Sequence, residues 1–221
     1  MNKRRLLLLV AALTMLIVNA KADTLTLGLP WNYAQNLVPI NTAYADYGFE
    51  NEFIYPASSM GNMEGGLITQ LTFYAARDSM DFSETFLLRM EEMEDSVTQA
   101  NMWVHTNAMQ LVWTGSVAIR DSLWTITLDT AFPYHGGNLL LSFRGLGQDN
   151  GFWTSDNIFY VYATNHRTLT YRTANSGHEY GNSWPSASPH VLPSVSFVYT
   201  PNAVAVCHRQ LTITADSIGT H

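Results

Sequence analysis

The chain has 221 residues, with 18 acidic and 11 basic side chains and a formal net charge of −7. An acidic chain of this kind cannot neutralise a phosphate backbone, which argues against nucleic acid as a partner. Charged residues make up only 13% of the chain and hydrophobic residues 47%, a balance that favours β-structure over exposed helices. The single cysteine, Cys207, excludes a disulfide within the chain.

The N-terminus predicts export. Lys3, Arg4 and Arg5 precede an apolar run from Leu6 to Val18, and Ala20-Lys21-Ala22 places small residues at the positions that signal peptidase reads. The apolar run is too short for a membrane span of roughly 20 residues. We therefore expect residues 1–22 to be a signal peptide, and the mature chain to be secreted or held at the cell surface without membrane insertion. Cleavage leaves 7 basic residues, all arginine, against 18 acidic ones.

Short runs of alternating apolar and polar residues recur along residues 23–200. Trp124, Ile126 and Leu128 alternate with Thr125 and Thr127, which is the two-residue period of a strand. About ten such runs are separated by Gly, Pro, Asn and Ser clusters, and they predict an all-β fold, an antiparallel two-sheet β-sandwich of the jelly-roll type. They are 24–29, 52–55, 67–74, 84–90, 110–113, 123–129, 138–143, 158–162, 168–172 and 194–199.

Two segments, 92–109 and 129–141, carry signals for a helix and for a turn that leads into a central strand. Residues 92–109 are the one stretch that suggests a short helix. After a strand that closes at Asp129, Phe132-Pro133-Tyr134 predicts a bend and Gly136-Gly137 positive φ angles. Apolar residues at successive positions from Leu139 to Leu141 then predict a central strand with neighbours on both faces.

The ordered series of these segments, over about residues 44–200, carries a family resemblance. Phe53-Ile54-Tyr55-Pro56, Gly65-Gly66 before residues 67–74, Val112-Trp113-Thr114-Gly115 and the stretch 132–141 are similar to a jelly-roll module of secreted and surface proteins of Bacteroidetes. The chain resembles the cleaved-adhesin domains that accompany gingipain-type proteases. This resemblance implies a non-catalytic adhesive or ligand-binding module, usually one of several in a longer polypeptide. His135 stands where that family often has an acidic residue.

The loop 175–185 is the sequence's candidate ligand site. Tyr180 and Trp184 would stack on a sugar ring, while His178 and Glu179 would supply hydrogen bonds. Trp184 could equally fold back to cover one end of the sandwich, since tryptophan is mostly buried.

The sequence offers two candidate metal sites, and calcium is the one candidate cofactor. Asp149 and Asn150 lie in a turn without the full acidic pattern of a calcium loop. The cluster of Glu91, Glu92, Glu94 and Asp95 is interpreted as a solvated strand end, with a second calcium site as the alternative.

No local motif for catalysis is present in the sequence. The expectation is a secreted or cell-surface module that binds a glycan or an extracellular protein. A glycan hydrolase on the same scaffold is the alternative, since Asp121, Asp129, Asp149 and Asp156 lie near strand ends. A further alternative is a structural spacer domain of a larger secreted enzyme. Residues 201–221 are interpreted as a linker followed by the truncated start of a fibronectin-III-like domain, or as a tail.

The leader generates the first testable prediction. Exported protein should begin at Asp23, because the apolar run and the Ala-Lys-Ala order place cleavage after Ala22. Intact-mass analysis of the exported chain measures this directly. A mass that retains residues 1–22 would refute it.

Overall fold

The computed structural model describes residues 21–28, 33–35, 37–42, 48–94, 109–146, 154, 156–164, 168–172, 186–188 and 191–201. For residues 168–172 and 186–188 it describes the backbone alone. Thirteen strands and one 3-10 turn lie in these ranges, and the predicted all-β fold is confirmed. The elements are β1 (Asp23–Leu27), β2 (Tyr33–Gln35), β3 (Phe49–Tyr55), η2 (Ala57–Ser59), β4 (Gly66–Tyr74), β5 (Ser79–Met93), β6 (Gln110–Arg120), β7 (Leu123–Tyr134), β8 (Asn138–Gly145), β9 (Phe159–Ala163), β10 (Thr168–Arg172), β11 (Ser186–Ser188), β12 (Val191–Pro193) and β13 (Val195–Thr200). No helix among the described residues is long and apolar enough to span a bilayer.

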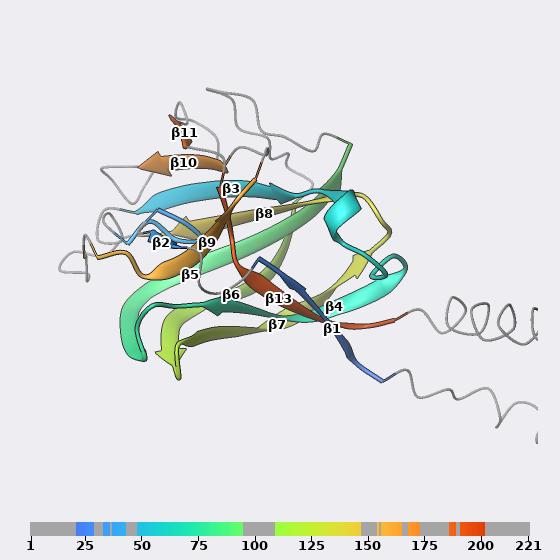
Figure 1. The fold of residues 1–221 in the computed structure, drawn as a ribbon, viewed down its shortest axis with the longest axis horizontal. Helices are drawn as coiled ribbons and strands as arrows, with labels where there is room; N and C mark the ends of the chain where they lie inside the picture. Colours follow the sequence, from blue (N-terminus) through green and yellow to red (C-terminus); the bar gives the residue numbers. More distant parts are fainter. Residues whose placement is uncertain are drawn as a thin grey trace, which may run out of the picture.

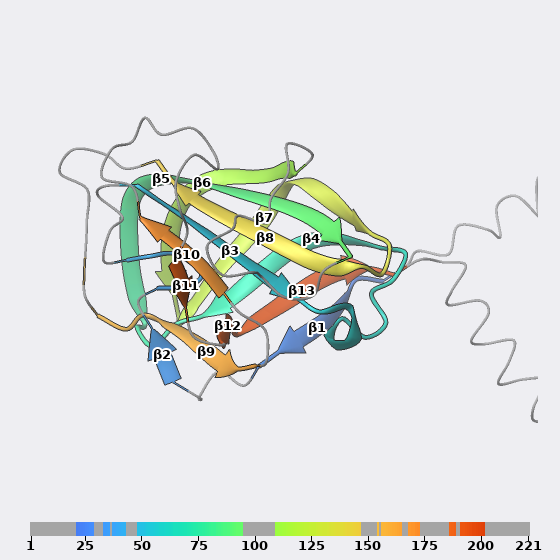
Figure 2. The ribbon, with the colours of Figure 1, turned by 90° about the horizontal axis from the view of Figure 1, so that it is seen from above.

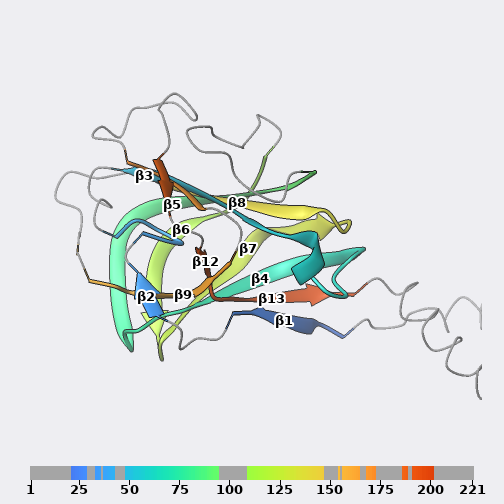
Figure 3. The same ribbon diagram turned by 45° about the horizontal axis from the view of Figure 1, so that its top comes forward.

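Ten strands form one antiparallel sheet in the order β1-β13-β4-β7-β6-β5-β8-β3-β10-β11, and β12-β9-β2 form a second. The large sheet folds over on itself, so that β1, β13, β4 and β7 face β8 and β3 across the core (Figures 1 and 3). The long strands β5 and β6 curve from one layer to the other at the left of Figure 3. The fold is thus an antiparallel β-sandwich.

The curvature of β5 coincides with an irregularity in its pairing with β6. Phe82 pairs with Val117 and Phe86 with Gly115, so residues 83–85 oppose Ser116 alone. Extra residues on one strand bend it and increase its twist. The bulge therefore lets one sheet supply both layers of the sandwich.

The small sheet lies along one side of the sandwich (Figure 2). The backbone of Phe159 in β9 forms an isolated bridge to Ala75, just after β4. On the edge strand β12 of the small sheet, the Pro193 carbonyl accepts a hydrogen bond of 2.9 Å from the Tyr55 hydroxyl of β3. Burial raises the pKa of Tyr55 well above its ordinary value, so the hydroxyl keeps the proton that it donates. The small sheet is therefore attached to both layers.

An aromatic cluster fills the space between the layers. Trp124 of β7 is 1% exposed, and its ring centroid lies 5.4 Å from Phe73 of β4, 5.5 Å from Phe143 of β8 and 5.6 Å from Phe159 of β9. Phe143 in turn stacks on Phe53 of β3 at 6.1 Å. Such pairs contribute beyond their buried area. One tryptophan thus connects the two layers and the small sheet.

The predicted central strand is confirmed as β8, which pairs with β3 on one side and β5 on the other. Residues 139–143 are all buried. Leu139, Leu141 and Phe143 face the main core, whereas Leu140 packs with Ile54 and Met109 in a smaller cluster on the opposite face.

The predicted bend at residues 132–134 is wrong. Strand β7 does not close at Asp129 but continues to Tyr134, with Phe132 and Tyr134 buried and Pro133 exposed. Burial of the two rings outweighs the turn preference of proline. Proline has no N–H to donate to a neighbouring strand, so it is tolerated in a strand where its nitrogen faces away from the partner strand. The turn lies one step later, where Gly136 has the expected positive φ of 108°. The positive φ expected for Gly137 is not found.

Three strands were not predicted, namely β2, β11 and β12, and each has only three residues. Strands this short have no readable alternation. The suggested short helix within 92–109 does not include residues 92–94, since β5 extends to Met93 and Glu94 forms a bend. Residues 95–108 lie outside the described part of the chain.

The aromatic cluster generates a stability prediction. Trp124→Ala should lower the free energy of unfolding by about 3–5 kcal/mol, because it leaves a cavity where three sheet segments meet. The change is measured by urea unfolding that is monitored by far-UV circular dichroism, because this signal reports the β-structure and does not need Trp124 as a probe. As a control, Leu111→Ala on the neighbouring strand β6 removes a side chain that is 45% exposed and should change stability by less than about 0.5 kcal/mol. Equal losses in the two variants would contradict the assignment of Trp124 as the central contact.

Candidate functional site

The β6–β7 hairpin ends in a tight turn made of two residues without glycine. Arg120 pairs with Leu123, and between them Asp121 and Ser122 have φ angles of 52° and 63°. Positive φ at both positions is typical of the type I′ turn, which usually takes asparagine or glycine. Left-handed backbone costs a residue with a side chain roughly 1–2 kcal/mol, so other contacts must hold this turn in place.

Hydrogen bonds to the segment between β4 and β5 supply those contacts. The Ser122 hydroxyl donates to the Asp78 carboxylate at 2.8 Å, and the Ser122 backbone N–H donates to the Asp78 carbonyl at 3.2 Å. The Ala75 N–H donates to the Ser122 carbonyl at 2.8 Å. Ser122 is thereby fixed against residues 75–78 by three bonds.

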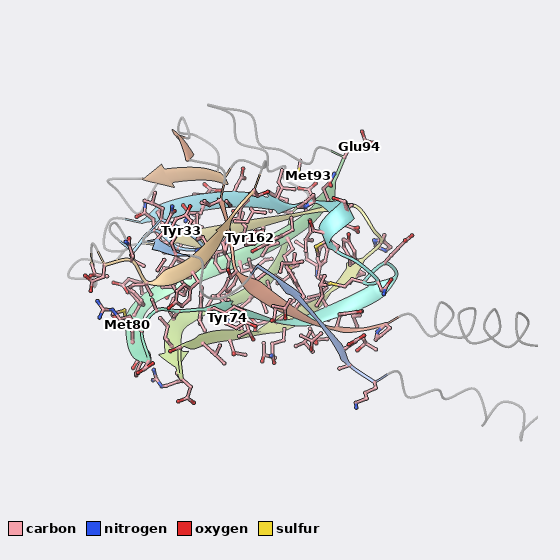
Figure 4. All side chains as sticks on the ribbon, viewed as in Figure 1. Tyr33, Tyr74, Met80, Met93, Glu94 and Tyr162 are labelled. Carbon is pink, nitrogen blue, oxygen red and sulfur yellow. The ribbon has the colours of Figure 1, made fainter. Side chains whose placement is uncertain are left out.

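Strand β9 closes the third side. The Ala76 N–H donates to the Ile158 carbonyl at 2.7 Å, next to the bridge between Ala75 and Phe159. These bonds bring Tyr160, which is partly exposed, to the same end of the sandwich as the hairpin tip. Met80, near the start of β5, marks this end in Figure 4, and Met93 and Glu94 mark the opposite one.

The three segments enclose a pocket of about 360 Å³. Its lining combines two tyrosines, two carboxylates, one hydroxyl and three small or aliphatic side chains: Tyr74, Tyr160, Asp78, Asp121, Ser122, Ala75, Ala76 and Leu123. The Tyr74 hydroxyl lies 2.7 Å from Ser196 Oγ, which fixes the ring at the pocket wall. Aromatic surface beside a few polar groups is the usual composition of a small-molecule site.

Two ion pairs flank the pocket. Arg77 binds Asp156 at 2.6 Å, and Arg120 binds Asp81 through both nitrogens at 2.7 and 3.0 Å. The hydrogen bond from Arg120 lowers the pKa of Asp81, and the guanidinium charge adds to this effect. The two arginines nearest the pocket in sequence are thus engaged by carboxylates outside its lining.

Within the acidic cluster at the end of β5, Glu92 has a structural role instead of the solvated one expected, whereas Glu94 is exposed as expected and Asp95 lies outside the described residues. The Glu92 side chain, 18% exposed, accepts hydrogen bonds from the His135 N–H at 2.9 Å and the Gly137 N–H at 2.8 Å. His135 Nδ1 lies 2.7 Å from the same carboxylate. Glu92 therefore holds the β7–β8 turn.

Asn138 completes this support by accepting a bond from the Ala57 N–H at 2.9 Å and donating one to the Glu94 carbonyl at 2.7 Å. Within the described ranges, no group of three or more His, Cys, Asp or Glu side chains is arranged to hold a metal ion.

The sequence-predicted ligand residues Tyr180, Trp184, His178 and Glu179 lie outside the described residues, as do the calcium candidates Asp149 and Asn150. Of the strand-end carboxylates, Asp121 lines the pocket and Asp156 flanks it. Asp129 lies inside β7 and accepts a bond of 2.9 Å from the Thr114 N–H.

Sequence analysis missed the pocket as a unit and singled out Asp121 alone among its lining residues. The one local signal was Asp121-Ser122 between two alternating runs, which predicts a turn but not its neighbours.

Comparison of the chain with protein-family models and with curated proteins finds no match.

The strained hairpin tip generates the next prediction. Asp121→Val should lower the free energy of unfolding by about 1–2 kcal/mol, because a β-branched side chain fits poorly at positive φ. Asp121→Asn is the matched control and should be nearly neutral, since asparagine tolerates this conformation. Chemical denaturation measures both. If the valine variant were as stable as the asparagine one, the positive φ at residue 121 would be refuted.

Proposed function

We propose that this chain is a secreted or cell-surface binding module without catalytic activity, and that it binds a glycan in the pocket formed by residues 74–78, the hairpin tip and Tyr160. The observation that carries this proposal is the presence of two tyrosines and two carboxylates in one pocket. A sugar ring has apolar faces and a polar edge, so it is matched by aromatic surface beside hydrogen-bond acceptors.

The rigidity of the pocket supports a binding role. Five backbone or side-chain contacts among residues 75–78, Ser122 and Ile158–Phe159 hold its walls together before any ligand arrives. A preformed site loses little conformational entropy on binding, which improves affinity for a small ligand. A spacer domain has no need of such a pocket.

Binding without hydrolysis is favoured by the surroundings of the two carboxylates. A glycosidase needs a general acid that is protonated near neutral pH, which proteins achieve by burial in apolar surroundings. Asp78 and Asp121 are both exposed, and Asp78 already accepts a hydrogen bond from Ser122. They are better placed to accept hydrogen bonds from sugar hydroxyls than to donate a proton.

The proposed export of the module is supported by the N-terminal sequence. Asp23, the first residue expected after cleavage, is also the first residue of β1.

Tyr160→Ala tests the proposed site. The exported chain is first screened on a glycan array, and the affinity for the strongest ligand is then measured by titration calorimetry. Loss of the stacking ring should weaken binding about tenfold, which corresponds to roughly 1.4 kcal/mol, while the melting temperature changes little.

Tyr33→Ala is the matched control. Tyr33 pairs with Val161 in the same small sheet and therefore projects from the face opposite to Tyr160, and it is 44% exposed. It should leave the affinity unchanged. The proposal fails if the array shows no glycan ligand, or if both tyrosine variants bind as tightly as the wild type.

A further inference from the structure

We infer that the pocket discriminates between saccharides by charge, accepting short neutral or amine-bearing sugar units and rejecting acidic ones. This inference rests on the proposed glycan-binding function and adds the class of ligand to it. It depends on the distribution of charge around the pocket and on the pocket's volume.

The lining contains negative charge without a compensating cation. Asp78 and Asp121 contribute carboxylates, and none of the described residues that line the pocket is Lys, Arg or His. The chain has no lysine beyond Lys21. Lys21 precedes β1 and lies at the far end of the sandwich, because Asp23 pairs with Tyr199 and Tyr199 with Ile68 near the start of β4.

The neighbouring arginines do not reverse this charge. Arg77 and Arg120 are bound by Asp156 and Asp81, so each guanidinium is balanced by its own carboxylate. Among the described residues that line the pocket, Asp78 and Asp121 therefore carry the net charge. An acidic sugar such as a uronate would bring a third carboxylate next to these two.

The hydrogen-bonding chemistry of the lining points the same way. A carboxylate accepts hydrogen bonds and cannot donate them, so the ligand group that meets Asp121 has to be a donor. Sugar hydroxyls and protonated amines are donors, whereas an ionised uronate is an acceptor. An ammonium group would add a charge-assisted bond, which is about twice as strong as a neutral one.

The volume limits the size of the bound unit. At about 360 Å³ the pocket lies near the lower end of the range of ligand sites, which runs from about 300 to 1,000 Å³. A pocket of this size takes a short unit of a glycan chain rather than a long stretch of it.

The test compares three trisaccharides of similar size on the exported full chain by titration calorimetry. They are a glucosamine trimer at a pH where its amines are protonated, an N-acetylglucosamine trimer and a galacturonic acid trimer. Affinity should be highest for the amine and at least about tenfold lower for the uronate, since like charges near a protein surface repel by more than they do in bulk water. The preference should shrink at high salt.

Asp121→Asn assigns the effect to the pocket. It should weaken the glucosamine trimer about tenfold while leaving the N-acetylated trimer nearly unchanged, because the amide keeps an acceptor but removes the charge. Glu64→Gln removes an exposed carboxylate before β4, at the far end of that strand, and should alter neither affinity.

The outcomes distinguish a failure of the charge discrimination from a failure of the proposed glycan binding. Equal or tighter binding of the uronate, with Tyr160→Ala still weakening it, would overturn the charge discrimination and leave the glycan site intact. An unchanged glucosamine affinity in Asp121→Asn would also overturn it. Absence of binding by all three trimers, together with an array without ligands, would refute the proposed function itself.

Discussion

The contact between Trp124 and Phe143 across the core is the interaction on which the remaining structure depends. Trp124 lies on β7 and Phe143 on β8, and their rings are 5.5 Å apart. With one cysteine in the chain, no disulfide holds the layers together. Away from the curved strands β5 and β6, dispersion and hydrophobic burial of large rings hold them, and the cluster around Trp124 concentrates both where the layers and the small sheet meet.

The same packing explains why the pocket has a fixed shape. Ring packing holds the layers together, and the curved strands β5 and β6 join them at one end. There the β6–β7 hairpin meets the β4–β5 segment, and the left-handed pair Asp121 and Ser122 is held by bonds to Ala75 and Asp78. Backbone held in such a conformation persists only when its surroundings determine it. The aromatic core and the hairpin tip are therefore parts of one arrangement, not independent features.

Much of the fold could be predicted from the sequence because its main strands alternate with a period of two. Strands β4, β7 and β8 carry clear alternation or continuous apolar runs, and β10 was predicted with its observed bounds. The start of β5 was not predicted, because the charged residue Glu84 occupies a buried position between Phe82 and Phe86 and interrupts the apolar pattern. The far half of β6 was not predicted, because its buried positions change from even to odd numbers between Val112 and Val117. Phe132 and Tyr134 were assigned to a bend because Pro133 lies between them, and only the tertiary burial of their rings decides otherwise.

The candidate site was far less predictable. Its residues come from β4, the β4–β5 segment, the hairpin tip and β9, which are separated by up to 86 positions between Tyr74 and Tyr160. No local spacing brings such residues together. The sequence pointed to the aromatic loop 175–185 because its residues are adjacent, and adjacency is the one relation that a single sequence displays directly.

The antiparallel pairing of β1 with β13 has a consequence for how the module is presented. Asp23 pairs with Tyr199, so the chain enters and leaves the sandwich side by side, on the right in Figure 1. Tyr199 is level with Ile68 of β4, whereas the pocket lies beyond Phe73 at the other end of that strand, about 17 Å further at 3.4 Å per residue. If the module is attached at either end to another polypeptide or to a surface, the pocket therefore lies at the end of the sandwich that points away from the attachment.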